Sequence, residues 1–217
     1  VSVPVVGSVT ARTANEVPST TLNLGDVTIG HNVTLNQDAT VSSLTIQTDK
    51  AFTASDNSER VLTITKSTTG TVSTLVNNGT WSSGTGGSTV VFTGAPSSGD
   101  AIHQTSGTIA FNNVTVNKTG GSNNVGSSFG SGATIAGNFK IGSGGYVSTA
   151  PPTGFYLSSA ILIFNQGEAA NYDVNIGDKT WSTTEIPRSI TILSGAVTLN
   201  ESRNVTTAVL VSSGATL

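Results

Sequence analysis

The stretch LGDVTIGHNVTLNQDATVSSLTI, residues 24–46, carries the pattern that decides the fold. It holds the triplets Val27-Thr28-Ile29 and Leu44-Thr45-Ile46, which begin 17 positions apart. Because side chains alternate between the two faces of a strand, the outer residues of each triplet would point inward and the threonine outward. Asn36-Gln37-Asp38 lies between the triplets, and residues of these types favour turns. The stretch therefore predicts short strands with one buried face, joined by polar corners.

Similar triplets recur along most of the chain. They are Leu62-Thr63-Ile64, Val90-Val91-Phe92, Ile109-Ala110-Phe111, Val114-Thr115-Val116, Ile161-Leu162-Ile163, Ile190-Thr191-Ile192 and Val209-Leu210-Val211. Several of them begin 17 to 19 residues apart, which favours an all-β, right-handed parallel β-helix (a solenoid) with coils of roughly 17–20 residues. The central threonines of four triplets (28, 45, 63 and 191) would face solvent. A β-sandwich is the alternative, although its turns come every 8–12 residues.

The repeat has interruptions that suggest how the chain is divided. We expect residues 1–23 to form an N-terminal leader or cap and residues 24–217 to form the β-helix. Two loop excursions are expected to leave the coil, one near 142–159, which contains two prolines, and one near 165–188, which is richer in charge. The pattern is still running at residue 217, and a solenoid with an open end exposes unpaired strand edges. We therefore expect the natural polypeptide to continue beyond this residue, or another subunit to cover this end.

Composition excludes several functional classes. Charged residues make up 10% of the 217 residues, with 9 Lys and Arg against 12 Asp and Glu, so no basic surface for nucleic acid is expected. No apolar run approaches the roughly 18 residues of a membrane-spanning helix, so we expect no membrane insertion by this segment. The lack of cysteine excludes disulfides, thiol catalysis and cysteine-based zinc sites. No cofactor is expected.

Several phrases of the sequence resemble a family of surface proteins. They include Asp26-Val27-Thr28-Ile29, Val76-Asn77-Asn78-Gly79-Thr80 and Phe111-Asn112-Asn113-Val114-Thr115-Val116. These phrases are similar to repeats of very large secreted surface proteins of Bacteroidetes, which are autotransporter-like or adhesin-like parallel β-helix proteins typically exported by the type IX secretion route. The resemblance covers residues 24–141 and, more loosely, 186–217. It implies an extracellular location, at the cell surface or in a filament, and a C-terminal sorting domain in the full-length protein.

Aromatic and polar residues in the interruptions are candidate ligand contacts. Tyr172, Asp173, Asp178 and Trp181 lie in the second excursion, and Tyr156 lies in the first. Carbohydrate recognition uses this combination, because sugar rings stack on aromatic rings while polar side chains bind the hydroxyls. The same rings would alternatively cover apolar surface where the coil is interrupted.

Histidines and carboxylates show no catalytic pattern. His31 and His103 are the only histidines, and neither lies in a nucleophile or metal motif. Sugar hydrolysis needs two carboxyl groups at a set separation, and calcium-assisted chemistry needs a cluster of them. The closest acidic group is Glu168, Asp173, Asp178 and Glu185. We predict a non-enzymatic structural or adhesive segment with no catalytic or metal site, whose partners are surface glycans or other copies of the protein. A carbohydrate-binding or polysaccharide-degrading (lyase or hydrolase) β-helix module is the alternative.

Overall fold

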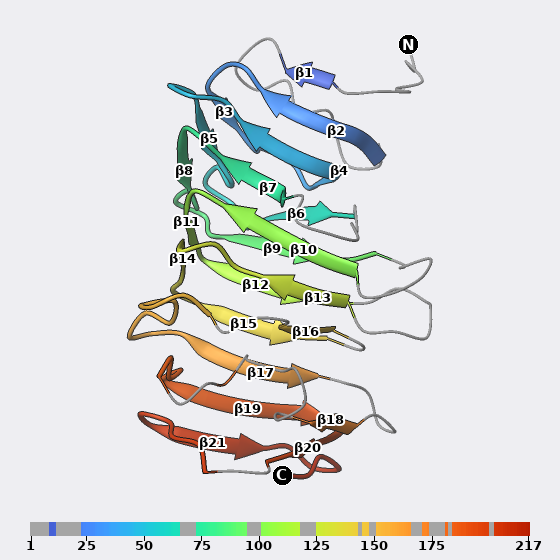
Figure 1. Ribbon diagram of the computed structural model, residues 1–217, viewed down its shortest axis with the longest axis vertical. Helices are drawn as coiled ribbons and strands as arrows, with labels where there is room; N and C mark the ends of the chain where they lie inside the picture. The colour runs from blue at the N-terminus through green and yellow to red at the C-terminus, as the bar shows by residue number, and fades with distance from the viewer. Residues whose placement is uncertain are drawn as a thin grey trace.

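The computed structural model describes residues 9–11, 23–65, 73–94, 101–117, 125–142, 145–147, 151–165, 171–173, 181, 184–199 and 202–217. Within these ranges the chain is all-β, with no helix, as the sequence predicts. In this part of the chain there is accordingly no helical segment with the length and apolarity to span a bilayer. The strands stack along one axis, with the N-terminal strands at one end and the C-terminal ones at the other (Figure 1).

Fourteen strands form one large open sheet, in which neighbouring strands are parallel. Its main ladder consists, in spatial order, of β1 (Val9–Ala11), β2 (Asn23–Ile29), β4 (Ala39–Ile46), β6 (Arg60–Ile64), β9 (Ser88–Phe92), β12 (Asn113–Val116), β15 (Asn138–Ile141), β17 (Ile161–Asn165), β19 (Ser189–Ser194) and β21 (Ala208–Val211). Parallel neighbours cannot be joined by a tight hairpin, so each connection passes through other strands before it returns to the ladder.

A second branch of the same sheet starts at β4. The first half of β4 pairs with β6, at Ala39↔Leu62, and its second half pairs with β7, at Leu44↔Leu75. The branch consists of β7 (Ser73–Asn77), β10 (Ala101–Ser106), β13 (Val125–Ser128) and β16 (Gly145–Val147). One long strand thus gives way to two shorter strands per layer.

Three smaller parallel sheets complete the stack. They are β3 (Val33–Thr34), β5 (Ala51–Thr53) and β8 (Thr80–Ser82); β11 (Thr108–Phe111) and β14 (Gly132–Ile135); and β18 (Asn171–Asp173) and β20 (Ala196–Thr198). Figure 1 shows β5, β8, β11 and β14 following one another down one side of the molecule.

The spacing of paired residues differs, over most of the stack, from the coil length that the triplets predict. Val27 pairs with Leu44, a step of 17, and Ile190 pairs with Val209, a step of 19, as expected. The prediction is wrong in between. Leu62 pairs with Val90, a step of 28, and Val90 pairs with Val114, a step of 24.

The error arises because one layer contains two apolar triplets. Val90 pairs with Val114 in β12, whereas Ile109 lies in β11 and pairs with Ala133 in another sheet. The polar corner at Asn112 turns the chain between β11 and β12. A triplet therefore predicts a strand, but the number of triplets does not give the number of layers.

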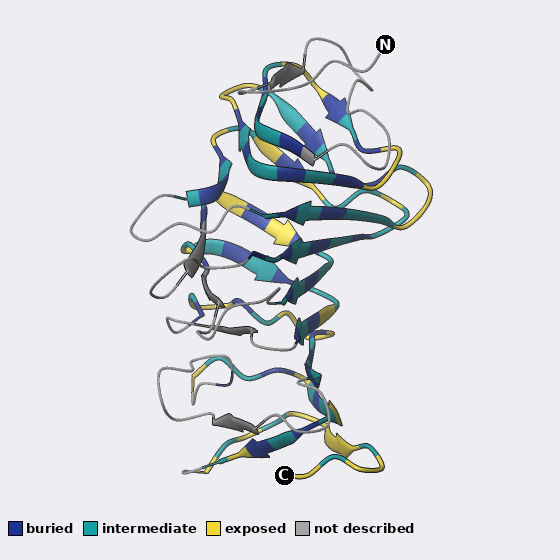
Figure 2. Ribbon diagram, turned by 90° about the vertical axis from the view of Figure 1, so that its right-hand side faces the viewer, coloured by how far each residue is buried: buried dark blue, intermediate teal, exposed yellow. Residues whose placement is uncertain are grey.

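The alternation of buried and outward residues is confirmed. In β4, β9 and β17 buried positions alternate with partly exposed ones. The threonines at 28, 45, 63 and 191 are all half-buried, and the apolar residues on both sides of each are buried. Figure 2 shows the resulting bands of buried and half-buried positions along the strands. The inward residues form one hydrophobic core that extends from Leu24 to Val197.

An aromatic ladder runs through the middle of this core. Ring centroids are 5.3 Å apart for Phe52 and Trp81, 5.9 Å for Trp81 and Phe111, and 6.1 Å for Phe111 and Phe129. Phe155 continues the ladder 4.8 Å from Phe129. Such tilted and edge-on contacts stabilise the fold in addition to the stabilisation that comes from burying the rings. The ladder makes residues 51–156 the most densely aromatic part of the core.

Segments expected to lie outside the coil contribute strands to the stack. In 142–159, β16 pairs with β13, and Tyr156 forms a parallel bridge with Ile135. Phe155 is fully buried, which holds this segment against the core instead of releasing it as a loop. In 165–188, β18 pairs with β20, and most of the remaining residues lie outside the described part. In the expected leader, β1 pairs with β2.

Candidate functional site

The predicted contact residues of the second excursion are only partly described. Tyr172 and Asp173 lie in β18, where their backbones pair with Val197 and Thr198. Asp178 lies outside the described residues. The ligand role of these three side chains stays a prediction.

The two other predicted contacts lie against the core. Trp181 is 2% exposed, and its indole Nε1 donates a hydrogen bond to the Asn204 carbonyl oxygen at 2.7 Å. Tyr156 is half-buried, with its ring 5.0 Å from that of Phe155 and 6.2 Å from that of Phe139. In this arrangement the Trp181 ring offers almost no face to a ligand, and the ring of Tyr156 covers apolar surface.

Glu185, from the acidic group of the same excursion, has a structural contact. Its Oε2 accepts hydrogen bonds from the backbone N–H groups of Gly154, at 3.0 Å, and Phe155, at 3.1 Å. The carboxylate thereby fixes the turn that brings Phe155 into the aromatic ladder.

The outward face of the main ladder carries a hollow of about 290 Å³. We call it the sheet-face hollow. It extends from β9 across β12, β15 and β17 to β19 and is lined by Glu59, Thr89, Asn113, Val114, Thr115, Asn138, Lys140, Ile163 and Leu193. Figure 1 shows that these strands are consecutive neighbours in the sheet. The hollow that their residues line therefore runs along the stacking axis.

Hydrogen bonds orient the polar wall of the hollow. The Asn113 Oδ1 accepts the backbone N–H of Asn138 at 2.8 Å, and its Nδ2 donates to Asn112 Oδ1 at 3.1 Å. At the far end, the Thr89 hydroxyl donates to Glu59 Oε1 at 3.2 Å. Because side-chain contacts between layers fix these groups, they present an ordered set of donors and acceptors to solvent.

Lys140 supplies the positive charge of the hollow. Register places it between Thr115 on β12 and Ile163 on β17. Within the described part of the chain, the one ion pair is that between Arg60 and Asp56, so no described carboxylate neutralises Lys140. Its ammonium group is a cation beside amides and hydroxyls.

The wall on the Lys140 side of the hollow, away from Glu59, is apolar. Register shifts by one residue between Phe164 and Asn165, where β17 meets β19. Leu193 follows the buried Ile192, so the alternation of the strand points it outward, with 43% of its surface exposed, and it lines the hollow together with Ile163. The hollow therefore combines hydrogen-bonding groups, a lysine ammonium group and an aliphatic surface.

The residue pattern of the sequence does not predict this site, and its lining residues are not the ones predicted as ligand contacts. Its side chains come from separate strands, with a step of 24 from Val90 to Val114 and a step of 25 from Thr115 to Lys140. A repeat length close to these steps would have aligned Asn113 with Asn138, whereas the shorter predicted coil does not. No aromatic residue is among the described side chains that line the hollow, so a pattern of aromatic rings in the sequence does not indicate it.

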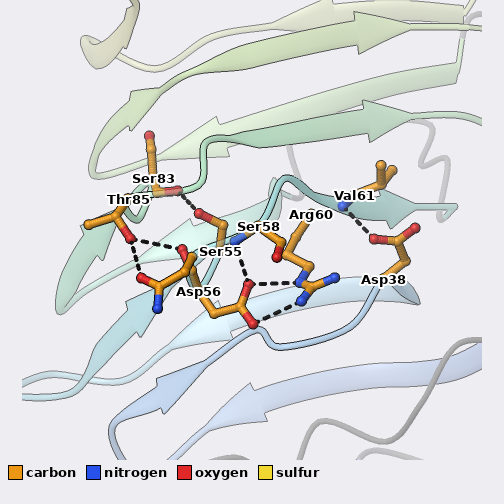
Figure 3. Close-up of polar contacts among 9 residues, drawn as sticks. Asp38, Ser55, Asp56, Ser58, Arg60, Val61, Ser83 and Thr85 are labelled. Atoms are coloured by element: carbon orange, nitrogen blue, oxygen red, sulfur yellow. Dashed lines mark hydrogen bonds and ion pairs between the residues drawn. The ribbon is translucent and has the colours of Figure 1, made fainter.

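A second group of charged residues forms a corner near the N-terminal end (Figure 3). Asp56 and Arg60 make a two-point ion pair, with distances of 3.0 Å and 2.8 Å, and the backbone N–H of Ser58 donates to Asp56 Oδ1 at 2.9 Å. The hydrogen bond from Arg60, aided by that from Ser58, lowers the pKa of Asp56 below its ordinary value.

Neighbouring contacts tie this corner to the adjacent layers. The Thr85 hydroxyl donates to the Asp56 carbonyl oxygen at 3.0 Å, and the Ser55 hydroxyl donates to the Ser83 carbonyl oxygen at 2.7 Å (Figure 3). Asp38 accepts the backbone N–H of Val61 at 3.0 Å. The carboxylates of Asp38 and Asp56 both accept hydrogen bonds from protein groups. The hydrogen bonds of this corner thus hold adjacent layers together.

The described residues include no group of three or more His, Asp or Glu side chains that would hold a metal ion. His31 is exposed at a corner, and His103 lies in β10. Comparison with known protein families, with curated proteins and with solved structures finds no match to this chain.

Proposed function

We propose that the chain is a segment of a right-handed parallel β-helix and serves as a non-enzymatic structural and adhesive part of a secreted surface protein. The observation that carries the proposal is the ladder of parallel strands from β1 to β21, with one core beneath it. At roughly 4.8 Å per strand, the nine spacings of this ladder extend about 43 Å.

The surface supports an adhesive role in an extracellular, cell-surface or filament setting. Outward positions are rich in threonine and asparagine, which bind water and ligands without strong charge. Contact surfaces repeated along a rod reinforce one another when a long protein carries many copies of them. Surface glycans or other copies of the protein are the partners proposed.

A carbohydrate-binding or polysaccharide-degrading module is the second candidate. Of these two functions, the sheet-face hollow favours carbohydrate binding. The hollow carries one carboxylate among its described lining residues, Glu59, whose Oε1 already accepts the Thr89 hydroxyl. Hydrolysis of a glycosidic bond by the usual route needs a second carboxyl group at a set distance. The hollow thus suits retention of a saccharide better than its cleavage.

The purified chain separates these functions. It would be incubated with a panel of plant, algal and microbial polysaccharides, with and without calcium, and both retention on immobilised glycan and release of new sugar ends would be measured. We expect retention of at least one glycan, or concentration-dependent self-association in light scattering, with no new ends. New sugar ends would overturn the non-enzymatic proposal, and a chain that neither binds nor self-associates would overturn the adhesive one.

A further inference from the structure

The sheet-face hollow has the chemistry for a particular class of ligand. We propose that it binds a short acidic saccharide, with a uronic carboxylate at Lys140 and ring hydroxyls at the amides of Asn113 and Asn138. This inference rests on the adhesive role proposed above and names the ligand class of that role.

The polar groups of the hollow match a ligand rich in hydroxyls. Beyond its bonds within the protein, the Asn113 amide keeps a second N–H and a second acceptor lone pair, and the Thr115 hydroxyl donates and accepts, so both groups can bond sugar hydroxyls. Asn113 and Asn138 lie on adjacent strands, and Thr115 lies beside them on the same outward face. A volume of about 290 Å³ is at the lower end of ligand pockets, which suits one or two sugar rings at a time.

The charges of the hollow give the ligand a direction. Lys140 is on β15, and the Glu59 carboxylate is held by Thr89 on β9, two strands away. Two strand spacings are roughly 10 Å. An acidic ring with its carboxylate at Lys140 would therefore direct its own hydroxyls, and not that carboxylate, toward Glu59.

The aliphatic wall completes the match. Ile163 and Leu193 lie on the Lys140 side of the hollow and present an apolar surface to the C–H face of a ring. An acidic peptide would also satisfy Lys140, but the backbone groups of strands inside a sheet are engaged with their neighbours, so a peptide could not be bound by strand addition. A ligand in the hollow can therefore contact side chains only, and the amides, hydroxyls and lysine there favour a hydroxyl-rich ligand over a peptide.

The test is an NMR titration of the labelled chain with a galacturonic acid trimer, beside the neutral galactose trimer of the same linkage. We expect the acidic trimer to shift amide resonances of residues 88–92, 113–116 and 138–141. We expect K140Q to weaken its binding by roughly twofold to fivefold, as loss of one ion pair at the surface implies, and the parent affinity to fall with added salt. The neutral trimer should bind parent and K140Q alike.

Two matched controls separate the hollow from general surface effects. K50Q removes the same charge from a residue that does not line the hollow, and should leave binding unchanged. L193S should weaken binding, whereas L157S should not, although both leucines are 43% exposed. Circular dichroism of each variant verifies that the strands are retained.

Several results would overturn the inference. They are the absence of shifts in the hollow, equal binding by K140Q and parent, equal loss in K50Q, or binding of triglutamate as tight as that of the acidic trimer, which would identify an acidic peptide as the ligand. A chain that keeps its parallel strands but binds no acidic saccharide would refute this inference alone. A chain that lacks the parallel strands would refute the proposed fold and function as well.

Discussion

The middle layers and the C-terminal layer use the same strand pattern with different results. In β19, Ile190 and Ile192 are fully buried, whereas Val209 and Val211, which pair with them in β21, are 39% and 41% exposed. In the part of the chain that the structure describes, β21 pairs with β19 alone. The triplet determines which face of the strand a side chain is on. Whether that side chain is buried depends on the presence of a neighbouring layer on both sides of its strand.

The two regions also differ in what fills the interior. The middle layers hold the aromatic ladder, in which Phe139 lies 5.5 Å from Phe129 and 5.6 Å from Phe155. The β19 and β21 triplets contribute only aliphatic residues. Stability should therefore be concentrated in the middle, and paired substitutions at equivalent positions test this.

The largest expected difference is between F139A and V211A. Phe139 is fully buried between layers, so its truncation leaves a cavity and should cost about 3–5 kcal/mol of unfolding free energy. Val211 is already 41% exposed, so V211A should cost less than about 1 kcal/mol. Urea denaturation measures both. Equal losses would mean that the aromatic ladder does not dominate the stability of the stack.

The next difference concerns two glycines with nearly the same backbone angle. Gly107 in the middle layers has φ +80°, and a Cβ there would lie 1.9 Å from the Asn77 carbonyl oxygen. Gly214 has φ +82° with nothing within 4 Å. G214A should cost about 1–2 kcal/mol from backbone strain alone. G107A should cost more than about 3 kcal/mol, because a clash between layers is added to the same strain.

Thermal unfolding of the two glycine variants separates these contributions. A G107A loss no greater than that of G214A would show that the close approach of the two layers at Asn77 does not exist in solution. The ranking depends only on the difference between the variants, since both carry the same strain.

The smallest expected effect is at the Asp56–Arg60 corner, beside the N-terminal end of the aromatic ladder. Because the pKa of Asp56 is lowered in the folded chain, its pairing stabilises the fold above the pKa of the unfolded chain, near 4. That contribution is lost as the pH falls through the folded value. D56N should therefore be less stable than the parent at neutral pH and should approach it in acid. Urea midpoints between about pH 6 and pH 2 measure this, and a constant gap across that range would contradict it.

Much of the fold could be predicted from local pattern. The alternation in Val27-Thr28-Ile29 and its repeats identified strands, their buried faces and the all-β class, because a strand records its orientation in every second residue. The layer length could not be predicted in this way. Ile109 and Val114 look like successive coils, yet they occupy two sheets of one layer.

The site was less accessible to sequence reasoning than the fold. Of the rings expected at the ligand, Trp181 is buried in the core and Tyr156 packs against Phe155, where rings contribute to stability. The sheet-face hollow depends instead on register, which brings Asn113, Asn138 and Lys140 together across strands. Register depends on the lengths of the connections between strands, and the residue types within a strand do not predict those lengths.

The most direct test of the stacked arrangement is the measurement of NOEs between backbone amide protons in the deuterated chain. The account predicts cross-strand contacts that join Val91 to Thr115 and Ala110 to Thr134, each a step of 24 between parallel layers. Contacts that join Val91 to Ala110 instead, or the close Hα–Hα contacts of antiparallel hairpins in a partly protonated sample, would contradict it.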